Sequence, residues 1–260
     1  MMPKQMENAT PKTGLIFLNG FYDLDRLVFY RRVIQKATDC GYPLICADGG
    51  LRIFDVLNKA FNSNFRPTQL IGDLDSVADD GLLTGQSNYL GIEAIPEWVG
   101  RFDKDVTDGQ LATVLSLEQF GCQRLHIYGS LPRFYEIDHF LGNLKLMRLV
   151  HQHCPEVDVE MRDPLQTVYR PRSVVRIERK TEIVSSQVNN DQPERISLIA
   201  HDRNVRVRRS SGLCWDLAGL WIDPDQPTAI RNEFLPAADS VTIELEPDSD
   251  PVLVIHNFYE

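Results

Sequence analysis

Acidic side chains stand at three places where an apolar, strand-like run of the sequence meets a helical pattern. They are Asp48, which follows the run 44–47; Asp73 and Asp75, which follow the run 70–72; and Asp103, Asp105 and Asp108, which lie just before and at the start of a helical pattern. Two carboxylates about 4 Å apart repel each other by about 4 kcal/mol at an effective dielectric constant of about 20. A bound Mg²⁺ relieves this repulsion, because it prefers carboxylate oxygens together with water and phosphate oxygens. The acids therefore predict a magnesium site that binds the phosphates of a nucleotide.

Glycines accompany these acids. Gly49 and Gly50 would let backbone amides approach an anion closely, and Gly72 removes a side chain beside Asp73. Any one junction, taken alone, is more often a simple turn. Thr107 and Gln110 also form a capping-box pattern, which could account for Thr107 and Asp108 structurally. The joint occurrence of three acidic junctions favours a functional site.

The elements that must position these residues form two groups. The first 165 residues or so alternate strand-like runs with helical patterns, and the sequence from there onward is rich in short strands separated by turn residues. The expected strands are 14–19, 43–47, 69–72, 91–95, 124–128 and 157–161 in the first group, and 173–178, 196–200, 205–209, 241–245 and 252–255 in the second. The pattern predicts an α/β domain over 1–165, with a mainly parallel sheet flanked by helices, and a smaller antiparallel β-sandwich domain over 166–260. In such a parallel sheet, ligands bind beyond the carboxyl ends of the strands, where the acids fall.

Composition narrows the functional class. The formal net charge is −10. Non-specific nucleic-acid binding requires a basic surface that neutralises phosphates, so we expect no nucleic-acid partner. No apolar run approaches the roughly 18 residues that a membrane-spanning helix requires, so we expect no membrane partner. The five cysteines are scattered, odd in number and without a CxxC pair, which indicates reduced thiols and a cytoplasmic protein.

Five segments, taken in order, resemble the thiamine pyrophosphokinase family. They are Ala-Asp-Gly-Gly at 47–50, Ile-Gly-Asp-Leu-Asp-Ser at 71–76, Asp-Lys-Asp-Val-Thr-Asp at 103–108, Asp-His-Phe-Leu-Gly-Asn-Leu at 138–144, and Ser-Ser-Gly-Leu-Cys-Trp-Asp-Leu at 210–217. The second and third segments are the most specific. The resemblance implies a homodimeric, Mg²⁺-dependent enzyme that transfers the pyrophosphoryl group of ATP to the hydroxyl of thiamine, giving thiamine diphosphate and AMP.

The resemblance also implies roles for single residues. Asp73, Asp75, Asp105 and Asp108 would be catalytic, and the first three would hold the metal. The nucleotide would be bound by Asp48, Gly49, Gly50, Lys104, Thr107, Arg133, Asp138 and His139, and thiamine by Ser210, Gly212, Trp215 and Asn232. Trp215 would stack on the cationic thiazolium ring, which an indole face attracts.

Two departures from the family pattern leave the acceptor open. The glycine-rich loop is altered over 129–139, and Arg231 stands where the family has a serine before Asn232. One alternative is a pyrophosphokinase for another alcohol, such as a pterin. The other is a non-catalytic homologue that binds thiamine or a nucleotide, although the retention of all four catalytic acids favours an enzyme. Outside these motifs, Trp221 is expected to pack, and the arginines at 203, 206, 208 and 209 to form a solvated or dimer-facing surface.

Overall fold

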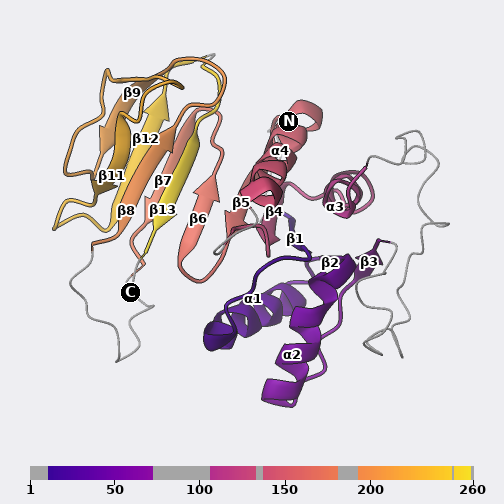
Figure 1. Ribbon diagram of the computed structural model, residues 1–260. Coiled ribbons are helices and arrows are strands. Elements are labelled where there is room, and N and C mark those ends of the chain that lie inside the picture. Colours follow the sequence, from indigo (N-terminus) through magenta and orange to yellow (C-terminus); the bar gives the residue numbers. More distant parts are fainter. Residues whose placement is uncertain (1–10, 73–105, 133–136, 181–192, 248, 259–260) are drawn as a thin grey trace, which may run out of the picture. The chain divides into compact units, whose positions relative to one another are not determined.

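A computed structural model describes residues 11–72, 106–132, 137–180, 193–247 and 249–258. The chain divides into two compact units, Met1–Val157 and Asp158–Glu260 (Figure 1). This division falls ahead of the boundary expected at 165/166. The reason is that β5 (Asp158–Arg162) pairs antiparallel with β6 (Gln166–Tyr169) and so belongs to the sandwich.

The first unit contains a parallel sheet in the order β4-β1-β2-β3. Its strands are β1 (Thr13–Phe17), β2 (Leu44–Ala47), β3 (Gln69–Ile71) and β4 (Arg124–Tyr128). Every residue of β1, β2 and β3 is buried, as expected for a parallel sheet that is covered on both faces. The prediction of an α/β unit is confirmed.

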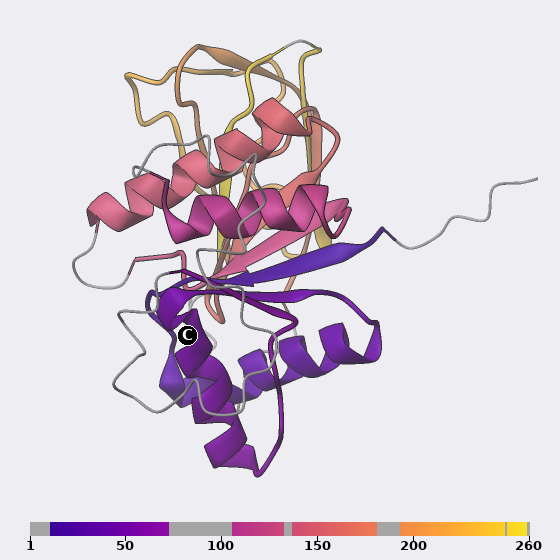
Figure 2. The same cartoon turned by 90° about the vertical axis from the view of Figure 1, so that its right-hand side faces the viewer.

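Helices cover both faces of this sheet (Figures 1 and 2). One face is covered by α1 (Leu27–Asp39) and α2 (Arg52–Phe61), and the other by α3 (Asp108–Glu118) and α4 (Ile137–His153). A 3-10 turn precedes each of the first two helices: η1 (Leu24–Arg26) precedes α1, and η2 (Asp48–Leu51) precedes α2. On the first face, the Phe17 ring lies 5.1 Å from that of Phe54 and 5.2 Å from that of Tyr128, centroid to centroid. None of the described helices is both long and apolar enough to span a bilayer.

The second unit is a sandwich of two antiparallel sheets. In one sheet the strands follow the order β11-β8-β13-β6-β5; besides β5 and β6 it contains β8 (Arg195–Ile199), β11 (Ala229–Glu233) and β13 (Leu253–Asn257). In the other sheet the order is β10-β9-β12-β7, with β7 (Val174–Glu178), β9 (Val205–Ser211), β10 (Trp221–Ile222) and β12 (Ser240–Leu245). Inward side chains such as Val175 and Ile243 meet Ile196 and Leu198 in one buried cluster. The predicted β-sandwich is confirmed.

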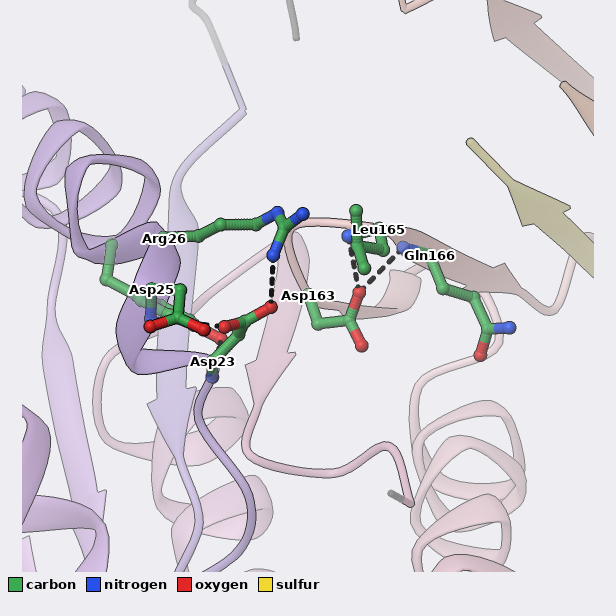
Figure 3. A network of polar contacts seen from close by, with 7 residues as sticks. Asp23, Asp25, Arg26, Asp163, Leu165 and Gln166 are labelled. Atoms are coloured by element: carbon green, nitrogen blue, oxygen red, sulfur yellow. Dashed lines mark hydrogen bonds and ion pairs between the residues drawn. The ribbon is translucent and has the colours of Figure 1, made fainter. Parts of the chain in front are cut away.

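Some strands of the sandwich had no clear signal in the sequence. Each of the five runs predicted beyond residue 170 overlaps a strand, but β6, β10 and β11 were missed. β10 has two residues, β11 contains an irregularity between Ala229 and Asn232, and β6 falls at the expected domain boundary. The turn into β6 is capped by Asp163, whose Oδ1 accepts hydrogen bonds from the amides of Leu165 and Gln166 (Figure 3). The expected strand 91–95 lies outside the described residues.

Candidate active site at the carboxyl edge of the parallel sheet

Asp48 occupies a strained and buried position where β2 ends. Its φ angle of +45° is in the left-handed region, which costs a non-glycine residue about 1–3 kcal/mol. Its Oδ2 accepts a hydrogen bond of 3.3 Å from Nδ2 of Asn19. Its Oδ1 is buried and has no hydrogen-bond partner among the described residues. A buried carboxylate oxygen without a partner is costly, so this atom is available to a ligand or cation.

Gly72 brings Asp48 close to a second acid. It follows β3 with a φ angle of +126°, and a Cβ built there would lie 3.1 Å from Oδ2 of Asp108 and 3.1 Å from Cβ of Asp48. The acids at the end of β2 and the start of α3 therefore lie against the same glycine. Asp73 is the next residue in the sequence. Two of the three acidic junctions thus meet at one place, as the sheet topology predicted.

Five of the residues predicted to hold the metal or to bind the nucleotide, Asp73, Asp75, Lys104, Asp105 and Arg133, lie outside the described residues. Within the described part of the chain, no three His, Cys, Asp or Glu side chains form a metal-binding group. The two acids that can be placed nevertheless fit a hard divalent cation, since both supply carboxylate oxygens and one of these is buried without a partner.

The glycines after Asp48 have a structural reason that the sequence did not reveal. A Cβ on Gly49 would lie 2.1 Å from Oδ1 of Asn19, and one on Gly50 would lie 2.0 Å from the carbonyl oxygen of Phe17. The backbone of η2 therefore lies directly against the end of β1. The missing side chains make room for this close approach within the protein, and a role in nucleotide binding stays a prediction.

A cavity of about 610 Å³ adjoins this edge within the first unit. This volume is in the usual range for small-molecule sites. Its lining comes from the loop after β1 and the start of α2: Asn19, Gly20, Phe21, Tyr22, Asp23, Leu24, Asp25, Gly49, Arg52, Ile53 and Val56. The loop is held by Asp23, which accepts from the amide of Asp25 at 3.2 Å and pairs with Arg26 at 2.8 Å (Figure 3).

This loop was not among the predicted site segments. A signal was nevertheless present, because Asn19 and Gly20 follow a strand of the same sheet, as Asp48 does. Gly20 also makes a close backbone approach, since a Cβ there would lie 2.0 Å from the carbonyl oxygen of Gly129 after β4.

Three residues predicted to bind the nucleotide lie at the starts of α3 and α4. Thr107 caps α3: its Oγ1 accepts from the amide of Gln110 at 3.3 Å, and Oε1 of Gln110 accepts from the amide of Thr107 at 2.8 Å. This confirms the capping box. Asp138 and His139 are exposed in the first turn of α4. Their role in nucleotide binding stays a prediction.

In the sandwich, Ser210, Gly212, Trp215 and Asn232 meet around one loop. The buried Asn232 holds the backbone of Trp215 from both sides: its Nδ2 donates to the carbonyl at 2.7 Å and its Oδ1 accepts from the amide at 3.2 Å. The Trp215 side chain is 60% exposed. A large aromatic side chain is thus presented to solvent on a firmly held backbone.

Ser210 and Gly212 shape the same loop. Oγ of Ser210 donates to Asp216 at 2.5 Å and accepts from the amide of Leu217 at 2.8 Å. The bond from Ser210 lowers the pKa of the Asp216 carboxyl. Gly212 has a φ angle of +80°, and a Cβ there would lie 2.2 Å from the carbonyl oxygen of Ser240. The glycine is therefore required for packing, and the serine acts here as a turn-forming side chain.

Arg231 lies at the irregularity in β11, beside Asn232. It has a φ angle of +63°, its amide donates to Oγ of Ser197 at 2.9 Å, and its side chain is exposed. The arginine that departs from the family pattern therefore extends from a distorted, not a regular, part of the strand.

The expectation that Trp221 is a packing residue is wrong. This residue lies on the short edge strand β10 and is 56% exposed, with the guanidinium carbon of Arg206 5.7 Å from its ring centroid. A two-residue edge strand offers little cover to so large a side chain. Nearby, Arg208 pairs with Glu244 at 2.9 Å, as expected of a solvated surface.

No protein-family model matches the sequence, and no curated protein matches it significantly. Solved structures of thiamine pyrophosphokinases, however, share its fold. The structure from Bacillus subtilis is 19% identical with a TM-score of 0.69, covering 96% of this chain and 100% of the other. That from yeast is 15% identical with a TM-score of 0.70, covering 96% and 88%. That from Geobacillus thermodenitrificans is 18% identical with a TM-score of 0.66, covering 95% and 98%. The chain has the fold of the thiamine pyrophosphokinases.

Proposed function

We propose that this protein transfers the pyrophosphoryl group of ATP to the hydroxyl of thiamine, forming thiamine diphosphate and AMP. The observation that carries the proposal is the meeting of Asp48 and Asp108 at Gly72, directly before Asp73-Leu74-Asp75, at the ligand-binding edge of a thiamine pyrophosphokinase fold. Acids from separate junctions of a parallel sheet converge there, as a site for a metal-bound polyphosphate requires.

The proposed binding of the donor relies on charge and position. Asp48 and Asp108, joined by Asp73, Asp75 and Asp105 of the neighbouring motifs, would hold Mg²⁺ against the ATP phosphates. When bound, Mg²⁺ would neutralise the negative charge that develops on the phosphate oxygens. Lys104 and Arg133, both close to these motifs in the sequence, would add positive charge. Phosphoryl-type transfer requires mainly such positioning and electrostatic stabilisation.

The proposed reaction is a single displacement. The thiamine hydroxyl oxygen forms a bond to the β-phosphorus as the bond from that phosphorus to the α,β-bridging oxygen breaks, and AMP leaves with the bridging oxygen. The hydroxyl proton would pass to a carboxylate of the acidic edge, for which Asp75 and Asp105 are the candidates. The exposed indole of Trp215 would receive the cationic thiazolium ring.

One assay tests the proposal and its two alternatives. The purified protein is incubated with ATP, Mg²⁺ and thiamine, and both AMP and thiamine diphosphate are followed. Both products are expected. AMP release that depends on a neutral alcohol such as a pterin, and not on thiamine, would instead identify another acceptor. Thiamine or nucleotide binding without AMP release would identify a non-catalytic homologue.

The proposal includes the assembly and location implied by the resemblance, a homodimer in the cytoplasm. Light scattering on the purified protein tests the dimer, for which a mass of twice the 29.7 kDa chain is expected.

A further inference from the structure

We infer that Asn19, which none of the matched motifs contains, is a positioning residue that orients the Asp48 carboxylate toward the metal ion that would bind the phosphates. The inference rests on the proposed function of this edge. It concerns a residue in the loop after β1 and a carboxylate directly after β2, 29 positions apart in the sequence.

Asn19 is held between Asp48 and the backbone that follows it. Its Nδ2 donates to Oδ2 of Asp48 at 3.3 Å. Its Oδ1 occupies the space beside Gly49, where a Cβ would come within 2.1 Å. The amide group therefore has one side against the carboxylate and the other against the η2 backbone, and any side chain at position 49 would displace it.

This contact determines which oxygen of Asp48 remains open. A carboxylate can rotate about its terminal torsion, which has a broad energy profile. Because Asn19 donates to Oδ2, rotation is opposed, and Oδ1 is left buried and without a partner among the described residues. Cβ of Asp48 and Oδ2 of Asp108 both lie against Gly72, so the two acidic residues are neighbours at this edge. Oδ1 is thus buried, has no hydrogen-bond partner among the described residues, and is held in a fixed orientation. Such an oxygen is suited to bind a cation.

Hydrogen bonds that orient a metal ligand have measurable effects on the metal. Removing such a supporting partner weakens metal affinity or activity by about 10- to 100-fold. Asn19 must also be neutral, because an aspartate in its place would put a second negative charge against Asp48. We therefore expect Asn19→Ala, which removes the donor, to weaken metal binding.

The experiment measures binding of Mn²⁺ in the presence of ATP by electron paramagnetic resonance, and so does not depend on turnover. Asn19→Ala is expected to weaken Mn²⁺ binding by about 10- to 100-fold. The matched control is Asn58→Ala. The Asn58 carboxamide accepts from the amide of Phe65 at 2.7 Å and donates to its carbonyl at 2.9 Å, so it stabilises a turn in the same unit. This control should lower the thermal midpoint and leave Mn²⁺ binding unchanged.

The same measurement in an Asp48→Asn background distinguishes an effect that acts through the Asp48 carboxylate from a non-specific destabilisation of the site. There, adding Asn19→Ala should weaken Mn²⁺ binding by less than twofold, because the carboxylate that Asn19 orients is already absent. Wild-type Mn²⁺ affinity in Asn19→Ala, or an equal loss in Asn58→Ala, would overturn the inference. If the wild-type protein binds Mn²⁺ with ATP but forms no thiamine diphosphate, the proposed function fails and the role of Asn19 is still decided. A wild-type protein that binds no Mn²⁺ with ATP would overturn both.

Discussion

Replacing Gly72 with alanine tests whether this glycine determines the geometry of the acidic edge. The added Cβ would lie 3.1 Å from Oδ2 of Asp108 and 3.1 Å from Cβ of Asp48. Carbon contacts are favourable at about 3.5–4.0 Å, so both acids would have to move by a few tenths of an ångström. The backbone would resist as well, because Gly72 has a φ angle of +126°, in a region that residues with a Cβ rarely adopt.

The expected effects on stability and on turnover differ in size. Backbone strain of this kind costs about 1–3 kcal/mol. At about 2–4 °C per kcal/mol for a domain of 150–250 residues, the thermal midpoint should fall by roughly 2–12 °C. A misplacement of about 1 Å in a catalytic site can cost about 100-fold in rate, so even the smaller shift here should lower AMP release by roughly tenfold. The loss of turnover should therefore exceed what partial unfolding explains at the assay temperature.

Gly121→Ala is the matched control. Gly121 also has a positive φ angle, +61°, but a Cβ there would meet nothing within 4 Å. It should cost about 1–2 kcal/mol of stability through its backbone and leave turnover unchanged. Thermal denaturation and Mg²⁺-dependent AMP release are measured for both variants. Equal turnover in folded Gly72→Ala and Gly121→Ala would refute the idea that Gly72 sets the spacing of Asp48 and Asp108.

Three further predictions concern the sandwich. Trp215→Ala should raise the KM for thiamine by about 2- to 30-fold, the value of a lost cation–π contact, whereas Trp221→Ala, at a similarly exposed site, should leave this KM unchanged in the same steady-state assay. Asn232→Ala should lower the free energy of unfolding in urea by about 1–3 kcal/mol and raise the same KM, because the Trp215 backbone loses its two hydrogen bonds. Burial lowers the pKa of His256 below its ordinary value of 6.5. As the pH falls, the unfolded chain therefore takes up a proton at this histidine before the folded protein does. The free energy of unfolding should be level above about pH 7 and fall as the pH drops below about 6.5, in urea titrations at several pH values. His256→Phe should lose this slope, and the exposed His201→Asn should keep it.

The sequence itself predicted much of the fold and part of the site. The alternation of strand-like and helical patterns indicated a parallel sheet, and such a sheet has the carboxyl ends of all its strands at one edge. For this reason the meeting of Asp48, which follows a strand, and Asp108, which begins a helix, was predictable from their places in the sequence. The capping box of Thr107 and Gln110 was predictable too, because it depends on residues three positions apart.

Tertiary structure decided the partners and orientation of these residues. The bond from Asn19 to Asp48, and that from Asn232 to Trp215, join residues 29 and 17 positions apart, and each depends on how separate strands are placed. The glycines at 49 and 50 illustrate the same limit: their sequence suggested room for an anion, whereas the space beside them is filled by the end of β1. Local sequence patterns predict periodicity and helix caps, because these involve residues that are close together in the sequence. They do not predict which side chain fills a given space, because that depends on segments brought together only by folding.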